Sequence, residues 1–568
     1  MLSDRQIGYP SVDKPWMKFY PEEKINNEIL QKTITQYLKH CVEQNNCINQ
    51  IALEYYGTTY TYEEMFKQSD IIAKALSAKG LHEGDYIALC MPSIPETIFL
   101  LLGANRLGIV VKMIDPRINV ERIRENIGTD CKMVFMIDAY AEKMSSISNV
   151  KWISVPAYAS MKGMLRILAR AKSVKKQGTW KWDEFYKSGF ESSEILNDIP
   201  YKKDTPATII YTSGTTGTPK GAVLSNDNII SVCYQQKFGW PGLVNGYSFL
   251  EIMPPFIAYG LVCGIYSSLC SGCRLILIPK FDPKGFNDIL LKHRPNIVMG
   301  VPAFFERMLT DKKLKNADLS FLKFPVVGGD RMNIVSEKGV NDFFSLHGVK
   351  TNLIKGYGMT ELSSCCILNI NGDCNKLGSC GIPLIDTNIM IYDWDKKQEK
   401  TYDKTGELLI SGPSKMLGYI NIEDEKEVIW TDDLGREWIR TGDIAKVDEE
   451  GNVTVVDRIK RMIIRPDGHN VFPAHIENIL REMEIIKAVA VVGIPDENLK
   501  NGEWPVAFCV LQEHVNDEEA RSRINDYQKE HIPPRDLAKE IFFIEKIPYT
   551  SSGKVDYKEL EKMIDLIA

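Results

Sequence analysis

The N-terminal third of the chain alternates between stretches with the apolar spacing of helices and short apolar runs. Residues 61–80 place Ile72 and Leu76 at helical spacing, after Thr61 as a helix N-cap and before a glycine that ends the helix. Residues 86–91 (YIALCM) form an apolar run of the kind found in buried strands. This alternation predicts an α/β fold with largely parallel sheets.

The pattern changes toward the C-terminus. Residues 401–420 combine apolar runs with glycine-rich turns, which predicts a hairpin. The final part of the chain restarts an α/β pattern with apolar runs at 488–495 and 506–511. We therefore predict a large N-terminal domain of layered α/β subdomains with a β-rich subdomain, residues 1–458, and a small C-terminal α+β domain, residues 459–568.

One long segment carries no charge. No charged residue lies between Glu251 and Arg274, which is long enough to consider a membrane-spanning helix. Pro254, Pro255 and several glycines favour a buried helix that lines a pocket instead.

A second unusual segment is strongly basic. Residues 160–176 contain six basic and no acidic residues, with Met164, Leu165 and Leu168 between them. Such a segment fits an amphipathic helix on an anionic membrane surface, and it also fits a solvated helix at the edge of a domain. Both interpretations remain open.

Composition narrows the class of protein. The chain has 568 residues, 44% hydrophobic and 25% charged, with a net charge of -6, which is typical of a globular protein with several subdomains. The chain has no excess of basic residues that would indicate nucleic-acid binding. The N-terminus lacks a signal peptide, and the 13 cysteines are scattered, so we expect reduced thiols in a cytoplasmic protein. The lone pair Cys270 and Cys273 lacks the partners of a zinc site.

The segment YTSGTTGTPKG, residues 211–221, concentrates glycine, hydroxyl groups and one lysine. Exposed backbone N–H groups, hydroxyls and the Lys220 ammonium suit a phosphate chain. Thr218 and Pro219 separate Gly217 from Lys220, so the segment is not a Walker A loop. Composition alone leaves a phosphate-binding loop and a mobile surface loop as alternatives.

Four further segments follow in order: GYGMTE at 356–361, TGD at 441–443, VDRIKRMIIRPDGHNVFPAHIE at 456–477 and PYTSSGKVD at 548–556. With the glycine-rich loop, they make the chain resemble the adenylate-forming superfamily of acyl-CoA synthetases, peptide-synthetase adenylation domains and luciferases. The resemblance spans nearly the whole chain, and it implies ATP, Mg²⁺ and a thiol acceptor such as CoA.

The resemblance implies roles for individual residues. The ATP phosphates would be bound by Thr212, Ser213, Gly214, Thr215, Thr216, Gly217 and Lys220. Adenine and ribose would be bound by Gly328, Gly329, Gly356, Tyr357, Gly358, Met359, Asp443 and Arg458. The catalytic residues would be Thr360 near the α-phosphate, Glu361 holding Mg²⁺, and Lys554 bridging the substrate carboxylate and the α-phosphate. Taken singly, Glu361 could be a helix-start carboxylate, Asp443 a turn residue and Lys554 a solvated lysine.

The resemblance also implies a two-step reaction with a mobile small domain. The acid attacks ATP to give an acyl-adenylate, and the small domain then rotates about a hinge at Lys460 so that the turn at Gly468 binds the thiol cofactor. The segment IRPDGHN is one residue longer than the commoner pattern, which leaves the roles of Asp467, His469 and Asn470 open.

The substrate is expected to be a fatty acid. Residues 13–23 (DKPWMKFYPEE) resemble the start of bacterial medium- and long-chain fatty-acyl-CoA ligases, and residues 162–176 resemble their insertion before the phosphate loop. Segment 13–23 could equally serve only to pack the N-terminus against the rest of the protein. Phe256, Tyr259 and Gly260 are the expected lining of the acyl pocket, with Ile257 where many relatives carry histidine.

Several alternatives remain. The protein could load a separate acyl carrier protein instead of CoA, carry out luciferase-like oxidation, or serve as a non-catalytic nucleotide-binding scaffold. The expected location is cytoplasmic, with peripheral membrane contact through the basic helix as an option.

Overall fold

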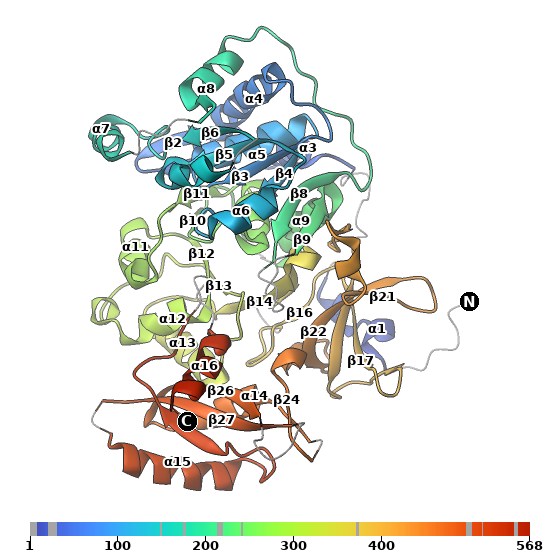
Figure 1. Cartoon of the computed structure of the whole chain (residues 1–568), viewed down its shortest axis with the longest axis vertical. Helices are drawn as coiled ribbons and strands as arrows, with labels where there is room; N and C mark the ends of the chain where they lie inside the picture. The colour runs from blue at the N-terminus through green and yellow to red at the C-terminus, as the bar shows by residue number, and fades with distance from the viewer. Residues whose placement is uncertain are drawn as a thin grey trace.

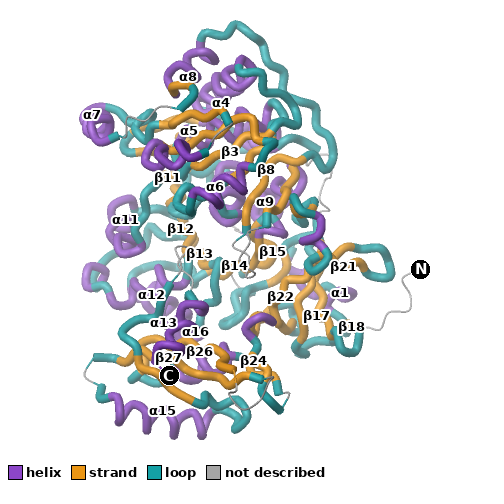
Figure 2. The backbone as a smooth tube through the Cα atoms, viewed as in Figure 1, coloured by secondary structure: helices purple, strands orange, loops and turns teal. Residues whose placement is uncertain are grey.

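The computed structural model describes residues 8–20, 31–147, 150–173, 178–212, 220–239, 242–370, 374–467, 469–495, 502–513, 515–549 and 555–567. Figure 1 shows a large body built on two sheets, a β-rich subdomain beside it, and a small domain at the C-terminal end. Figure 2 shows strands and helices alternating in the large body.

A nine-stranded, mainly parallel sheet forms one layer. In spatial order its strands are β16 (Ile382–Pro383), β15 (Ser364–Leu368), β14 (Ile354–Met359), β13 (Phe324–Val327), β12 (Ile297–Gly300), β10 (Ser248–Glu251), β11 (Arg274–Leu277), β1 (Ile51–Tyr55) and β2 (Thr58–Thr61). The neighbouring helices are α11 (Phe286–His293), α12 (Pro302–Thr310) and α13 (Ile334–Leu346).

An eight-stranded sheet forms the second layer. Its strands are β20 (Gly418–Tyr419), β9 (Gly221–Ser225), β8 (Pro206–Tyr211), β4 (Val110–Met113), β3 (Tyr86–Cys90), β5 (Cys131–Ile137), β6 (Lys151–Val155) and β7 (Trp180–Lys181). β9 runs antiparallel to both of its neighbours, β8 and β20, and the remaining neighbours are parallel.

Helices fill the space between and around these sheets. α9 (Asn226–Gly239) contacts β9 of one sheet and β15 of the other, so it lies between them. The other helices of this part are α3 (Ile34–Gln44), α4 (Tyr62–Ala78), α5 (Pro95–Arg106), α6 (Val120–Ile127), α7 (Gly163–Lys172), α8 (Trp182–Phe190), η3 (Tyr259–Ser267) and α10 (Ser268–Cys270). One continuous apolar core joins both sheets to α3, α4, α5 and α9.

The β-rich subdomain is a six-stranded sheet. It contains β18 (Gln398–Glu399), β17 (Asn388–Asp393), β19 (Gly406–Ser411), β22 (Glu437–Val447), β21 (Ile429–Thr431) and β23 (Val453–Arg458). The N-terminal segment packs on it through α1 (Pro10–Asp13) and η1 (Pro15–Phe19). Trp16 is fully buried, and the Tyr20 hydroxyl donates to the carbonyl oxygen of Pro383 at 2.9 Å, so segment 13–23 has a clear packing role in its described part.

The small domain has its own apolar cores. β26 (Ile486–Pro495), β27 (Glu503–Leu511) and β28 (Glu540–Phe543) form a sheet, with α14 (Pro473–Leu480), α15 (Asp517–His531) and α16 (Tyr557–Ile567) packed around it. The buried residues of its two clusters all lie after Lys460. This distribution suits the predicted boundary at 458/459, which stays a prediction. The mixed α/β architecture with a large and a small domain is as predicted.

Local predictions mostly hold, with one error. Thr61 caps α4 and accepts a hydrogen bond from the Glu64 backbone in a full capping box. Residues 401–420 do not form a hairpin: β19 pairs with β17 and β22, whereas β20 pairs with β9 of a different sheet. The uncharged segment contains a loop, η3 and α10, and among the described residues no helix is long and apolar enough to cross a membrane.

Candidate active site

A glycine pair follows the C-terminal end of β13, at the edge of a parallel sheet where ligands of α/β proteins bind. A Cβ atom on Gly328 would lie 3.3 Å from the Gly356 carbonyl oxygen and from Tyr259 Cζ. Gly329 has a φ of +77°, which disfavours other residues. Gly328 is therefore packed closely against the Gly356 backbone and the Tyr259 ring, and the role of the pair in adenine binding stays a prediction.

β14 and β15 form a tight hairpin that positions the GYGMTE motif. A Cβ on Gly358 would lie 1.5 Å from the Ser364 carbonyl oxygen, so only glycine fits. Ser363 and Ser364 both have positive φ, at 54° and 107°. Such values are costly outside glycine, and they fix the direction in which the short helix η6 (Thr360–Leu362) presents Thr360 and Glu361.

The Glu361 side chain is buried and held by a neighbour that the sequence did not reveal. Its Oε1 accepts a hydrogen bond from the Tyr419 hydroxyl at 2.5 Å, and the Met416 backbone N–H donates to the Glu361 carbonyl oxygen at 2.9 Å. The described residues contain no cluster of three or more potential metal ligands. A single carboxylate of this kind fits Mg²⁺, which takes few protein ligands and completes its shell with phosphate oxygens and water.

The base of the glycine-rich loop lies next to Glu361. Thr212 and Lys220 close the loop between β8 and β9, because the Thr212 N–H donates to the Lys220 carbonyl oxygen at 2.9 Å. The Lys220 ammonium is 5.4 Å from the centre of the Tyr419 ring and 3.5 Å from Asp424 Oδ1. Tyr419 therefore touches both the loop lysine and the predicted metal carboxylate. Ser213, Gly214, Thr215, Thr216 and Gly217 lie outside the described residues.

Tyr357, Asp443 and Arg458 form a hydrogen-bonded group contributed by β14, β22 and β23. The Tyr357 hydroxyl donates to Asp443 Oδ2 at 2.6 Å, and Arg458 Nε lies 3.0 Å from Asp443 Oδ1. Burial and the Asp443 carboxylate raise the pKa of Tyr357 well above its usual value, so the phenol stays a donor. The Asp443 carboxylate raises the pKa of Arg458. The group presents a buried carboxylate beside the aromatic residue predicted to contact adenine.

The small domain approaches this site. Asn333 Nδ2 donates to Asn478 Oδ1 of α14 in the small domain at 2.7 Å, whereas the Arg331 side chain donates at 2.6 Å to the carbonyl oxygen of Val456, which belongs to β23 of the large domain. Tyr549 of the small domain, which is 53% exposed, pairs with Val555 in a β-bridge.

Lys554 itself lies outside the described residues. The described residues on either side of it, Tyr549 and Val555, pair with each other. The exposed Asp330, which follows the glycine pair, contributes to the raised pKa of Tyr557 in the small domain.

The predicted hinge lies in the short helix η8 (Ile459–Arg461) directly after β23. Arg461 pairs with Glu477 at 2.7 Å and with Asp457 at 3.4 Å, and its guanidinium stacks on the Tyr557 ring at 3.9 Å. The Ala474 backbone N–H also donates to Asp457 Oδ2 at 2.8 Å. The residues flanking Lys460 are therefore attached to the small domain.

The turn expected on the CoA side is partly described. Gly468 lies outside the described residues, but the Arg465 N–H donates to the His469 carbonyl oxygen at 2.9 Å and closes the turn. His469 Nε2 lies 2.6 Å from Asp536 Oδ1, and Asn470 belongs to β25 (Asn470–Val471), which pairs with β24 (Ile463–Ile464).

The predicted acyl pocket lies around η3, a π-helix, which is a conformation frequent at functional sites. A Cβ on Gly260 would lie 2.1 Å from the Pro254 carbonyl oxygen, so the helix packs tightly on the loop that follows β10. Phe256 is buried, with the Arg117 guanidinium 5.2 Å from its ring centre. Phe256, Tyr259 and Gly260 lie within five residues of one another at the start of η3, and their role as the acyl lining stays a prediction.

Glu251 at the end of β10 is a buried acid that the sequence analysis did not single out. Its side chain is fully buried, and neither carboxyl oxygen accepts a hydrogen bond of ordinary geometry from the described residues. Burial raises its pKa well above the usual value. Neither Glu251, Tyr419 nor Asp424 belongs to a motif, so only their positions in the fold bring them to the site.

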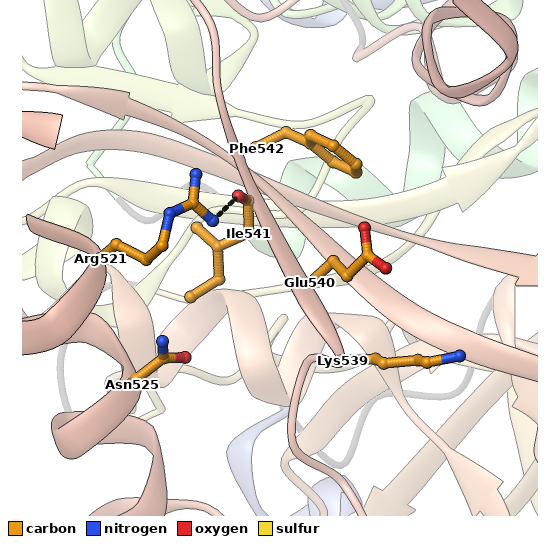
Figure 3. Close-up of a pocket in the computed structure, with 6 residues that line it drawn as sticks. All are labelled: Arg521, Asn525, Lys539, Glu540, Ile541 and Phe542. Atoms are coloured by element: carbon orange, nitrogen blue, oxygen red, sulfur yellow. Dashed lines mark hydrogen bonds between the residues drawn. The ribbon is translucent and has the colours of Figure 1, made fainter. Parts of the chain in front are cut away.

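A pocket also exists away from these residues. Figure 3 shows it in the small domain, where Arg521 and Asn525 of α15 face residues 539–542 across a hollow of about 360 Å³. Arg521 donates to the Ile541 carbonyl oxygen at 2.5 Å, so its charge already supports the fold. None of the predicted site residues lines this pocket.

Comparison with known proteins identifies the family. The model of the AMP-binding enzyme family matches residues 39–420, and that of the AMP-binding enzyme C-terminal domain matches residues 475–554. A long-chain-fatty-acid–CoA ligase of Bacillus subtilis is 29% identical over 570 residues, covering 95% of this chain and 96% of that protein. A 4-coumarate–CoA ligase of Solanum tuberosum is 27% identical, covering 88% of each chain.

Comparison with solved structures agrees with the family match. ATP-bound MatB from Rhodopseudomonas palustris superimposes with a TM-score of 0.80 at 22% identity, over 94% of this chain and 100% of that chain. The adenylate-forming CoA ligases use ATP, Mg²⁺ and CoA, the cofactors expected from the sequence. The family model spans most of the chain, and the protein therefore belongs to the AMP-binding enzyme family, as its motifs predicted.

Proposed function

We propose that the protein is a fatty-acyl-CoA ligase that couples ATP cleavage to thioester formation. In the first step a carboxylate oxygen of the acid attacks the α-phosphorus of ATP, the bond to the β-phosphate breaks, and pyrophosphate leaves. In the second step the CoA sulfur attacks the acyl carbonyl carbon and AMP leaves. The observation that carries the proposal is that Lys220, Glu361 and Asp443, from three separate motifs, lie around the same end of the two sheets.

The first step is opposed by electrostatic repulsion, because the substrate carboxylate must approach the negatively charged phosphates of ATP. We assign Lys220 and the glycine-rich loop to the β- and γ-phosphates, and Lys554 to the α-phosphate and the substrate carboxylate. Glu361, held by Tyr419, would hold Mg²⁺, which neutralises charge on the phosphates when bound. Positive groups placed before the reaction stabilise the charge that develops at phosphorus.

We assign Asp443 to the ribose hydroxyls, with Arg458 fixing its carboxylate and Tyr357 lying against adenine. Gly328, Gly329, Gly356, Gly358 and Met359 complete this surface, and Thr360 lies next to the α-phosphate in the assignment. For the second step, the small domain would turn at Lys460 and bring the Gly468 turn to the site.

The fatty-acid assignment rests on two observations. The Bacillus subtilis relative named above matches over nearly its whole length. Ile257, half-buried beside the buried Phe256, adds apolar surface to the predicted pocket. Apolar lining favours an alkyl chain, since each buried methylene contributes about 0.8 kcal/mol.

The test is pyrophosphate release with ATP, Mg²⁺ and a panel of fatty and aromatic acids, each with and without CoA. We expect turnover with fatty acids that rises sharply when CoA is added. Preference for 4-coumarate would contradict the fatty-acid assignment. A single turnover that CoA does not relieve would contradict CoA as acceptor and direct the search to a carrier protein.

A lysine variant tests the catalytic assignment. Lys554→Ala should lower adenylate formation by at least ~100-fold, the scale for losing one preorganised charge stabiliser, while ATP still binds. Lys562→Ala, which removes an exposed lysine of α16, is the matched control and should behave as the unaltered protein. Near-normal adenylation by Lys554→Ala would refute the role.

A further inference from the structure

α7 exposes apolar side chains that a water-facing helix normally lacks. Met164 is 68% exposed, Leu165 50%, Ile167 64% and Leu168 53%. Their spacing of three and four residues places them on one side of the helix, whereas Arg166 and Arg170 lie on the opposite side. Single exposed apolar residues are ordinary, but four on one short helix mark an interaction surface.

The segment around α7 is firmly attached to the domain on its N-terminal side. Just before the helix, the Ser160 hydroxyl donates to Glu96 Oε1 at 2.6 Å and accepts from the Tyr60 hydroxyl at 2.9 Å. At its C-terminal end, the Ser173 hydroxyl donates to Asp138 Oδ2 at 2.6 Å.

Glu96 and Asp138 are themselves buried. The exposure of the apolar side is therefore a feature of an anchored helix rather than of a loose end. Figures 1 and 2 both show α7 at the outer margin of the large domain, away from the small domain.

The charge around α7 indicates which kind of surface it binds. No aspartate or glutamate occurs between Glu142 and Asp183, a segment with nine lysines and arginines, although the whole chain has a net charge of -6. A basic segment with an apolar side matches a surface that is anionic outside and apolar beneath, which is an anionic lipid bilayer. An acidic protein or a nucleic acid would use the charges but leave the apolar side chains in water.

We propose that α7 docks the protein onto anionic lipid bilayers, lying in the plane of the interface. Its apolar side chains enter the boundary of the acyl chains, and the neighbouring lysines and arginines contact lipid phosphates. One helix of this size gives weak, reversible binding that salt weakens. The docking does not depend on which acid the enzyme activates.

Vesicle flotation of the full chain tests the proposal. One set of vesicles is phosphatidylcholine and the other mixes phosphatidylcholine with phosphatidylglycerol. The unaltered protein should float only with the anionic vesicles, and less at high salt. The triple variant Met164→Ser, Ile167→Ser and Leu168→Ser should lose flotation. Arg166→Gln with Arg170→Gln should weaken partitioning roughly 25-fold, since each basic residue near the surface contributes roughly fivefold.

The matched control removes exposed apolar residues elsewhere. Ile195→Ser with Leu346→Ser changes side chains that are 89% and 84% exposed, and it should float as the unaltered protein does. Equal thermal unfolding midpoints show that each variant is folded.

Three results would overturn the proposal. One is undiminished flotation of the triple serine variant, and another is equal binding to neutral and anionic vesicles. The third is a dimer in sedimentation that the triple variant abolishes without a change in flotation, because a second copy would then cover α7.

Discussion

Asp443 offers the sharpest test of the nucleotide assignment. Its carboxylate is buried, and each oxygen is already engaged, Oδ2 by the Tyr357 hydroxyl at 2.6 Å and Oδ1 by Arg458 at 3.0 Å. A carboxylate oxygen has room for a second donor, so the ribose hydroxyls can add to these contacts. A hydrogen bond to a charged group contributes about 1.5–3 kcal/mol, which is roughly 10- to 150-fold in apparent affinity.

The perturbation is Asp443→Asn, which keeps the size of the side chain but removes its charge. The unaltered protein should prefer ATP over 2′-deoxy-ATP or 3′-deoxy-ATP by roughly 10- to 150-fold in kcat/KM of pyrophosphate release. In the variant, this preference should fall to roughly 2- to 10-fold, the range for a hydrogen bond between neutral groups. ATP itself should lose affinity, whereas the deoxynucleotides should change little.

The matched control is Tyr357→Phe, which removes one donor to the carboxylate but leaves the charge in place. It should retain the preference for ATP. If Asp443→Asn discriminates between ATP and both deoxynucleotides as strongly as the unaltered protein, the carboxylate does not bind the ribose and the assignment is wrong.

Two further predictions concern buried acids. A Cβ on Gly264 would lie 2.2 Å from Glu251 Oε2, so Gly264→Ala should destabilise the protein by about 1–3 kcal/mol through overpacking and lower its thermal midpoint. Adding Glu251→Ala should relieve this loss in the double variant. If the effects of the two substitutions are simply additive, the two residues do not interact. Burial raises the pKa of Glu96 from 4.5 to about 7, so the folded state holds this proton more tightly than the unfolded state. The contribution of Glu96 to stability should be greatest below pH 4.5, decline as the pH rises to about 7 and stay constant above it. In Glu96→Gln, the thermal midpoint should no longer show this decline with pH. A pH profile identical to that of the unaltered protein would refute the raised pKa of Glu96.

Local features of this fold could be predicted from the sequence, because they depend on neighbours along the chain. The Thr61 cap of α4 needs only Glu64 three residues later, and the motif GYGMTE is recognisable by its residues, although the sequence did not predict the hairpin between β14 and β15. The order of strands could not be predicted, and residues 401–420 show why. β19 and β20 have the local pattern of a hairpin, but each finds a better partner in a different sheet.

The same limit applies to the site. The motif residues could be named, but Tyr419 acquires its importance only from its contact with Glu361, which is distant in the sequence. A buried tyrosine next to a carboxylate has no sequence pattern of its own. The basic segment at 160–176 was recognised as amphipathic, but its exposure depends on how Ser160 and Ser173 attach it to the domain.

The pairing of β20 with β9 has a consequence for how the protein matures during synthesis. Tyr419 lies opposite Ala222, so the strand that follows the glycine-rich loop obtains its second neighbour only after residue 419 has left the ribosome. Until then β9 is an open edge able to pair with foreign chains, and Glu361 lacks the Tyr419 hydroxyl. The predicted nucleotide site is therefore completed late, when most of the large domain has already been made.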